Sequence, residues 1–256
     1  MDFCFTIDDN IRFLRSLTKN KPASIFDNDY LSMLLRLRLK YGLKIQLNLF
    51  FADGAGFDLS RMTDRYAGEF AESSDWLKFS FHSYKESFRP YEFSAEKEVY
   101  DDMMKVNSEI TRFSCEKSLG KTTTIHYCLL TEGGIEATKK AGYRGLLGLF
   151  GDDEKPRFSY LLGIDESARA RRGEIVDSRS LKIGSIDAVL NTFSLAGAVE
   201  RVKELIGREH IRVMIHEQYF YPDYERYQPD FETKLDRVFA VLKQAGYESK
   251  FFEETI

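Results

Sequence analysis

Cysteine is scarce in this sequence, which has three among its 256 residues. Cys4, Cys115 and Cys128 lie far apart along the chain, so they form neither a C-x-x-C pair nor a disulfide framework. This use of cysteine is typical of proteins in a reducing compartment, and we expect a cytoplasmic location.

Long apolar runs, basic clusters and nucleotide-binding motifs are also lacking. The amino-terminal segment MDFCFTIDDN has no basic residues ahead of an apolar run, so the sequence predicts neither a signal peptide nor a membrane partner. The net charge is −4, and the short basic run 169–172 is flanked by acids, which argues against a nucleic-acid partner. The motifs G-x-G-x-x-G after the first strand and G-x-x-x-x-G-K-[ST] are absent, so a nucleotide-binding domain loses support.

What the sequence does have is a regular alternation of short apolar strands with helical patterns. The expected strands cover residues 2–7, 44–51, 76–82, 121–127, 144–150, 186–192, 211–216 and 247–252. The expected helices cover residues 30–42, 60–75, 94–113, 132–143, 194–207 and 231–246. Such alternation predicts an α/β fold with parallel strands, and without a reversal signal it favours a barrel. We predict one barrel domain over residues 1–256, with a β-hairpin insertion at about 151–185, where the alternation breaks.

Acidic residues and histidines lie at the carboxyl ends of several expected strands. Asp8 and Asp9 end the first strand, in FTIDDN. His82, His126 and His216, three of the four histidines, lie at or near the ends of three other strands. A barrel of parallel strands gathers its catalytic groups at these ends, so we expect Asp9 and His82 at one rim. Each residue alone has a structural explanation, since Asp-Asp-Asn is also good turn chemistry.

The two adjacent carboxylates indicate a cation. Like charges side by side repel each other unless a cation, a proton or hydrogen bonds lie between them. An aspartate, a histidine and one more nitrogen or oxygen ligand around an open position form the arrangement that activates water on a divalent metal. A metal ion would neutralise Asp9 and leave Asp8 free as a general base.

These segments resemble the motifs of the polysaccharide deacetylases, the NodB-homology carbohydrate esterases of family 4. FTIDDN resembles their T-F-D-D-G motif, FHSYKE resembles their H-[ST]-x-x-H motif, and VMIHE resembles their L-x-H motif. The resemblance implies a distorted (β/α)7 barrel that hydrolyses N- or O-acetyl groups on glycans with zinc or a similar divalent ion. Carried over by motif position, it implies that Asp8 is the base and His216 the acid, and that Asp9 and His82 bind the metal.

Three positions depart from the family pattern. Glu86 stands where the family has its second metal histidine. If a helical turn follows His82, Glu86 shares a face with it and can bind the metal, and otherwise Glu86 is a solvated charge. Asn10 replaces the motif's glycine and tolerates similar backbone angles. His126 stands in place of the arginine of the family's R-x-P-[YF] motif, and it either contacts substrate or reaches the metal itself.

The substrate contacts and the group that orients the acid are less defined by the sequence. We predict that His126, Glu217 and Tyr219 contact the substrate. Tyr219 belongs to the aromatic run EQYFYPDYERY, which can either stack on sugar faces or pack a loop. The candidates to orient His216 are Asp152, Asp153 and Asp187.

Two functions are consistent with these residues. The first is a metal-dependent hydrolase, with zinc as the expected metal, that removes acetyl or similar acyl groups from a small-molecule or oligosaccharide substrate. The second is a non-catalytic or weakly active carbohydrate-binding protein on the same barrel, since a fold does not determine a function. Bound metal with an open coordination position favours the enzyme, whereas Asp8 and Asp9 paired with basic side chains favour the binding protein.

Overall fold

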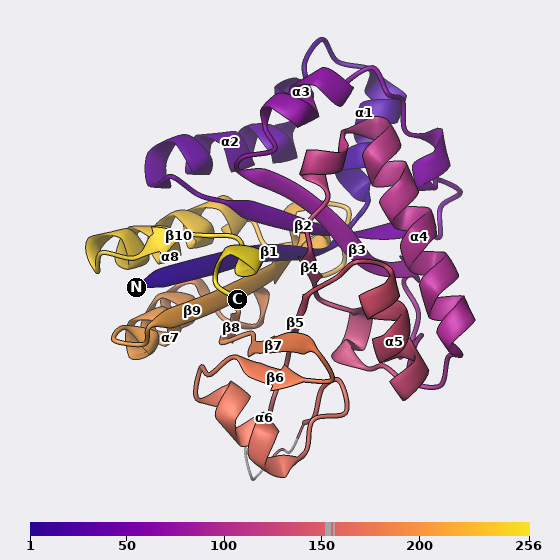
Figure 1. The fold of residues 1–256 in the computed structure, drawn as a ribbon. Coiled ribbons are helices and arrows are strands. Elements are labelled where there is room, and N and C mark those ends of the chain that lie inside the picture. Colours follow the sequence, from indigo (N-terminus) through magenta and orange to yellow (C-terminus); the bar gives the residue numbers. More distant parts are fainter. Residues whose placement is uncertain (152–154, 156) are drawn as a thin grey trace.

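The computed structural model describes residues 1–151, 155 and 157–256 (Figure 1). Its strands are β1 (Asp2–Asn10), β2 (Ile45–Ala52), β3 (Leu77–Lys85), β4 (Thr122–Thr123), β5 (Gly145–Gly148), β6 (Val176–Ser178), β7 (Leu181–Ser185), β8 (Ala188–Val189), β9 (His210–His216) and β10 (Glu248–Ser249). Its helices are α1 (Arg12–Asn20), α2 (Asp29–Tyr41), α3 (Ala67–Glu72), α4 (Glu96–Phe113), α5 (Glu132–Lys140), α6 (Ile164–Arg171), α7 (Leu195–Leu205) and α8 (Phe231–Gln244). The short 3-10 turns η4 (His126–Cys128), η5 (Leu190–Thr192) and η6 (Glu217–Phe220) follow β4, β8 and β9.

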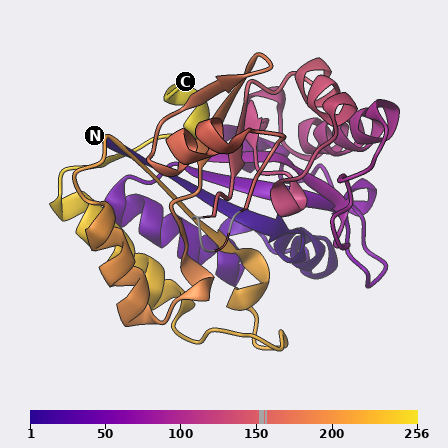
Figure 2. The same ribbon diagram turned by 90° about the horizontal axis from the view of Figure 1, so that it is seen from below.

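The strands form two mainly parallel sheets that together make a distorted (β/α)7 barrel, as predicted. In the larger sheet β3, β2, β1, β9 and β8 lie side by side in this order, and β10 pairs with the start of β1. In the smaller sheet the order is β4, β5, β7, β6, and the β6–β7 pair is an antiparallel hairpin. Figures 1 and 2 show the helices around the outside of the strands.

Hydrogen bonds outside the regular strand pairing join the two sheets. The Asp187 N–H, two residues beyond the end of β7, donates to the Arg212 carbonyl of β9 at 2.8 Å. On the other side of the barrel, Ser80 Oγ of β3 donates to the Thr122 carbonyl of β4 at 2.7 Å. The barrel is therefore closed partly by isolated hydrogen bonds, one of them from a side chain, instead of by continuous strand pairing. This irregular closure is what distorts the barrel.

The centre of the larger sheet carries the first residues of the candidate site. All nine residues of β1 are buried, because β1 lies between β2 and β9. Phe3 and Phe5 pack against Phe239 of α8, with ring centroids 5.8 and 4.8 Å apart. This packing fixes the strand whose far end holds the two aspartates. Among the described residues, no helix has the length and apolar character needed to cross a membrane.

The structure differs from the sequence prediction in several elements. Helix α1 was not predicted, because its N-cap position, Ile11, offers no capping side chain. The segment 151–185 contains helix α6 before the predicted hairpin, and the buried residues of α6 are Ser167 and Ala170, too weak an apolar pattern to indicate a helix. The expected strand 121–127 shortens to the two residues of β4, since the η4 turn begins at His126.

Candidate active site

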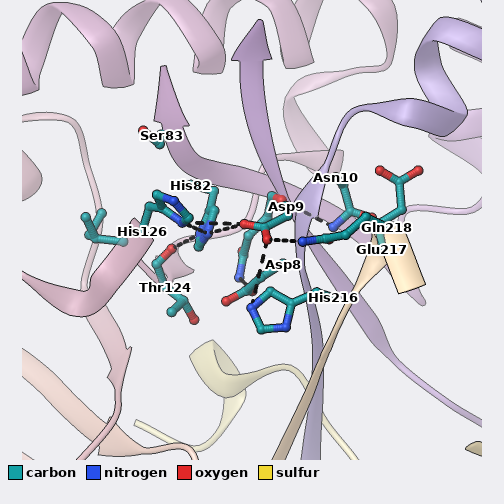
Figure 3. A network of polar contacts seen from close by, with 12 residues as sticks. Asp8, Asp9, Asn10, His82, Ser83, Thr124, His126, His216, Glu217 and Gln218 are labelled. Atoms are coloured by element: carbon teal, nitrogen blue, oxygen red, sulfur yellow. Dashed lines mark hydrogen bonds and ion pairs between the residues drawn. The ribbon is translucent and has the colours of Figure 1, made fainter. Parts of the chain in front are cut away.

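A cavity of about 840 Å³ opens where the carboxyl ends of the strands meet. Its lining includes Asp8, Asp9, His82, His126 and His216. Figure 3 shows these side chains converging on one point from β1, β3, β9 and the turn after β4. The prediction that Asp9 and His82 lie at one rim is confirmed, since Asp9 Oδ1 and His82 Nε2 are 3.0 Å apart.

A bulge at the end of β1 brings both aspartates to the same side. Successive side chains of a regular strand point to opposite faces, so adjacent carboxylates would normally separate. The pairing of β1 with β2 shifts register between Ile7 and Asn10, and Asp9 has a positive φ of 61°. Such a bulge redirects a side chain, and bulges are frequent next to active sites. Asp8 and Asp9 can therefore both line the cavity.

Asn10 stabilises this bulge through the hydrogen bonds of its side chain. Its Nδ2 donates to the Ile7 carbonyl at 2.5 Å and to the Asn48 carbonyl at 3.2 Å. Its Oδ1 accepts from the Tyr30 hydroxyl at 2.9 Å, and the residue is fully buried. The asparagine in place of the family's glycine thus has a structural role, because it holds the backbone turn by its side chain.

Asp9, His82 and His126 form a group whose ligand atoms all lie within 4.8 Å of one another. His126 Nδ1 lies 3.0 Å from His82 Nε2 and 3.5 Å from Asp9 Oδ1. Asp9 Oδ1 is buried and accepts no hydrogen bond within the described part of the chain. A buried carboxylate oxygen without a donor is unfavourable, and two imidazole nitrogens facing each other need a proton or a cation between them. The group fits a divalent cation.

The surroundings orient His82 toward the group and keep His126 neutral, although the neighbouring aspartates, Asp8 first, outweigh burial and raise the pKa of His82. His82 Nδ1 lies 2.5 Å from the Thr124 carbonyl, so the ring donates there and presents Nε2 to Asp9 and His126. Burial and the neighbouring His82 lower the pKa of His126 to about 3, so His126 is neutral at neutral pH. Neutral imidazole is the form that binds metals.

The two carboxylates have opposite electrostatic environments. Burial raises the pKa of Asp8, and the hydrogen bond from Asn48 Nδ2 to Asp8 Oδ1, at 2.6 Å, only partly opposes this effect. Burial also tends to raise the pKa of Asp9. The charges of the neighbouring histidines, of which His216 has the largest effect, outweigh burial and hold this pKa well below the usual range. Divergent pKa values in an aspartate pair are typical of one base and one permanently charged group.

His216 lies directly beside Asp8. The parallel pairing of β1 with β9 sets Asp8 opposite His216, and His216 Nε2 is 4.0 Å from Asp9 Oδ2. Its Nδ1 lies 2.8 Å from Oδ1 of Asn191, in the η5 turn, which fixes the ring with Nε2 toward the carboxylates. Among the described residues, the group that orients His216 is therefore the amide of Asn191 rather than Asp187, one of the three expected aspartates.

The structure accounts for those aspartates differently. Asp187 Oδ1 pairs with Arg208 Nη1 at 2.8 Å, and its Oδ2 accepts from the Arg212 N–H at 2.8 Å. It therefore stabilises the junction of β8 and β9 instead of contacting His216. Asp152 and Asp153 lie outside the described residues.

Glu86 lines the cavity but is not a member of the metal-ligand group. Strand β3 continues to Lys85, so no helical turn places Glu86 on the face of His82. Its side chain is exposed, yet partial desolvation of the carboxylate together with the charge of Asp9 raises its pKa. His126 takes the position in the group that the sequence analysis had expected for Glu86.

Glu217 does not lie on the cavity wall, where a substrate contact was expected. It is fully buried, and its oxygens accept the N–H groups of Ile11, Arg12 and Phe13, at 2.7, 2.9 and 2.7 Å, at the start of α1. Tyr219 is only partly buried and lies beside the His216 ring, with centroids 6.2 Å apart.

Three further polar residues complete the site, and the sequence analysis did not identify them. Gln218 Nε2 donates to Asp9 Oδ2 at 2.7 Å, while Asn48 and Asn191 hold Asp8 and His216. Asn48 carried a usable signal, because a polar residue inside the apolar strand QLNLFF suggests an inward-facing hydrogen bond. Gln218 and Asn191 lie in 3-10 turns, whose geometry has no comparable pattern.

Comparison with known proteins gives structural relatives alone. No family model matches this chain, and no curated protein does. One structural relative is a carbohydrate esterase family 4 (CE4) pseudoenzyme of Bacillus anthracis, solved as a mutant with restored enzymatic activity. It matches 99% of this chain with a TM-score of 0.58 and 13% identity. This chain spans 66% of the length of that relative.

Two further relatives are a family 4 acetyl xylan esterase and a peptidoglycan deacetylase. The esterase, from Clostridium thermocellum and in complex with a cobalt ion, matches with a TM-score of 0.57 and 12% identity over 99% of this chain and 89% of the other. The peptidoglycan N-acetylglucosamine deacetylase matches with a TM-score of 0.54 and 13% identity over 99% of this chain and 86% of the other. The chain therefore has the CE4 fold, which confirms at the level of the fold the resemblance seen in its motifs.

Proposed function

We propose that this protein is a metal-dependent hydrolase of the polysaccharide deacetylase type, which removes acetyl or similar acyl groups from a carbohydrate. The observation that carries this proposal is the group of Asp9, His82 and His126, set beside Asp8 in a fold shared with CE4 esterases and deacetylases. Buried polar atoms in native proteins normally have hydrogen-bond partners, so Asp9 Oδ1, which accepts no hydrogen bond from the described residues, supports a bound cation.

The donor set suits zinc or a similar ion. One carboxylate oxygen and two imidazole nitrogens are common zinc ligands, and a structural relative is in complex with cobalt. We assign Asp9, His82 and His126 as the ligands, and Glu86 remains a candidate to complete the set. When bound, the cation acts as a Lewis acid that polarises a carbonyl group and makes water more acidic.

Asp8 is the residue that we assign as the general base. Burial raises its pKa, so its carboxylate binds a proton more strongly than an exposed aspartate. The hydrogen bond from Asn48 holds Oδ1 in place. Asp8 accepts the proton of the water molecule whose oxygen attacks the acyl carbon.

His216 is the residue that we assign as the general acid. Asn191 Oδ1 contacts Nδ1 of the ring, so Nε2 points toward the part of the cavity where the carboxylates lie. The Nε2 proton passes to the sugar nitrogen or oxygen as its bond to the acyl carbon breaks, and the acid and the free amine or alcohol are released. Gln218 keeps Asp9 oriented throughout by its hydrogen bond to Oδ2.

The second candidate is a carbohydrate-binding protein without efficient catalysis. A CE4 pseudoenzyme shares the fold, with a TM-score of 0.56. Glu86 and Asn191 also stand where a metal histidine and an orienting carboxylate were expected. Against this candidate, no lysine or arginine among the described residues pairs with Asp9, and Asp8 accepts from an amide.

The test is acetate release from triacetylchitotriose and from acetylated xylo-oligosaccharides. We expect release by zinc-loaded protein and none after the metal is removed. Asp8→Asn is nearly isosteric and should lower the rate by about 10²–10⁴-fold without changing metal content. Glu204→Gln, on another wall of the same cavity, is the matched control and should retain the parent rate. An Asp8→Asn rate within about tenfold of the parent contradicts the assignment of Asp8 as the base.

A further inference from the structure

Two exposed aromatic rings extend outward from the metal-ligand group, and the inner one, Tyr127, lines the cavity. The Tyr127 ring packs edge-to-face against His126, with centroids 4.7 Å apart. The Phe88 ring packs edge-to-face against Tyr127, at 5.4 Å. Tyr127 lines the cavity and is 39% exposed, whereas Phe88 is 76% exposed. The two rings therefore continue outward from His126 toward the solvent.

The backbone that presents Tyr127 is strained. Tyr127 has φ 64° and ψ −2°, and Cys128 follows with φ 60°. Two consecutive residues in the left-handed region are unfavourable for side chains other than glycine. This conformation therefore costs energy at Tyr127, and adjacent exposed aromatic rings beside a cavity are typical of a ligand-binding groove.

A buried tyrosine holds this strained turn in place. The Tyr160 hydroxyl accepts from the Ile125 N–H at 3.1 Å and donates to the Leu147 carbonyl at 2.7 Å. The Tyr160 N–H donates to the Cys128 carbonyl at 3.2 Å. Backbone strain that the surrounding structure enforces in this way is concentrated at binding and catalytic sites. The ring of Tyr127 is thus presented in a fixed position before any ligand arrives.

We propose that Tyr127 and Phe88 form a subsite for a second sugar unit, next to the unit that carries the acyl group. The inference rests on the proposed function, which places the reacting acyl group at Asp9, His82 and His126. The C–H face of a pyranose ring is apolar and packs on an exposed aromatic ring, while the hydroxyl groups at its edge stay in water. The preferred substrate is accordingly an oligosaccharide rather than a monosaccharide.

The test compares the binding of triacetylchitotriose with that of N-acetylglucosamine, by calorimetry on zinc-loaded full-length protein. The Asp8→Asn background slows turnover by about 10²–10⁴-fold, so little substrate is consumed during the titration. The trisaccharide should bind more tightly than the monosaccharide. Tyr127→Gly and Phe88→Ala should each weaken trisaccharide binding by about 3–10-fold and leave monosaccharide binding unchanged. Tyr127→Phe should keep the preference, and so should the control Phe93→Ala, whose side chain is 88% exposed.

Thermal unfolding separates a binding role for Tyr127 from a structural one. Glycine adopts the left-handed conformation freely, so the Tyr127→Gly midpoint should be no lower than that of the parent. A lower midpoint with loss of both sugars would make Tyr127 a structural residue and overturn the proposal. Equal binding of the two sugars by the parent, or an unchanged preference in Tyr127→Gly, would overturn it too. Absence of acetate release with an intact trisaccharide preference would instead contradict the hydrolase and leave the subsite standing.

Discussion

Replacing Glu217 with glutamine should destabilise the protein, because one carboxylate holds the start of α1. Oε2 accepts the N–H groups of Ile11 and Arg12, and Oε1 accepts the Phe13 N–H and the Tyr221 hydroxyl. The amide nitrogen of glutamine faces at least one of these donors, which leaves a buried N–H without an acceptor at a cost of about 1–3 kcal/mol. Loss of the negative charge at the helix N-terminus adds about 0.3–1 kcal/mol.

Burial raises the pKa of Glu217, which shows that desolvation opposes part of this stabilisation. We therefore expect Glu217→Gln to lower the free energy of unfolding by about 1–3 kcal/mol, measured by urea denaturation near neutral pH. The control is Glu232→Gln, which removes a surface ion pair with Arg36 and should change stability by less than about 1 kcal/mol. Equal stability of Glu217→Gln and Glu232→Gln would refute the capping role.

Three further predictions concern the site. His126→Ala should weaken zinc binding strongly, whereas Glu86→Ala should weaken zinc binding only if Glu86 completes the ligand set. Calorimetric titration of zinc into the metal-free variants distinguishes the two residues. Parent-like zinc binding by His126→Ala would show that His126 is not a metal ligand. Since burial raises the pKa of Asp8 and a base acts only when deprotonated, kcat/KM should fall on acidification through a pKa above the ordinary aspartate value of about 3.9, and a limb at or below that value would contradict the assignment. Asn191→Ala should lower kcat without changing metal content, because it frees the ring of His216, and an unchanged kcat would exclude a positioning role.

The strand-end residues were predictable because a barrel topology brings the carboxyl ends of its parallel strands together. Asp8, Asp9, His82 and His216 were assigned to one rim from their positions alone, and all four line one cavity. The alternation of strands and helices likewise favoured a barrel, and the resemblance of the motifs supplied its (β/α)7 form. These features depend on local pattern and on chain order, which a single sequence contains.

The remaining features depend on contacts between distant segments. Helix α1 has no cap of its own, and its cap comes from Glu217 at the other end of the chain. The bulge that turns Asp9 into the cavity depends on Asn10 meeting β2 and Tyr30, which no spacing rule indicates. The inclusion of His126 in the metal-ligand group depends on the short η4 turn, where a longer strand was expected.

Metal analysis tests the central claim most directly. Protein purified without a histidine tag, stripped of metal and then dialysed against zinc, should bind one ion per chain and should release acetate from triacetylchitotriose only in that state. Asp9→Ala should lose both the ion and the activity, because Asp9 is the one carboxylate of the group with His82 and His126. A chain that binds no divalent metal, or whose acetate release is the same with and without it, would contradict the account.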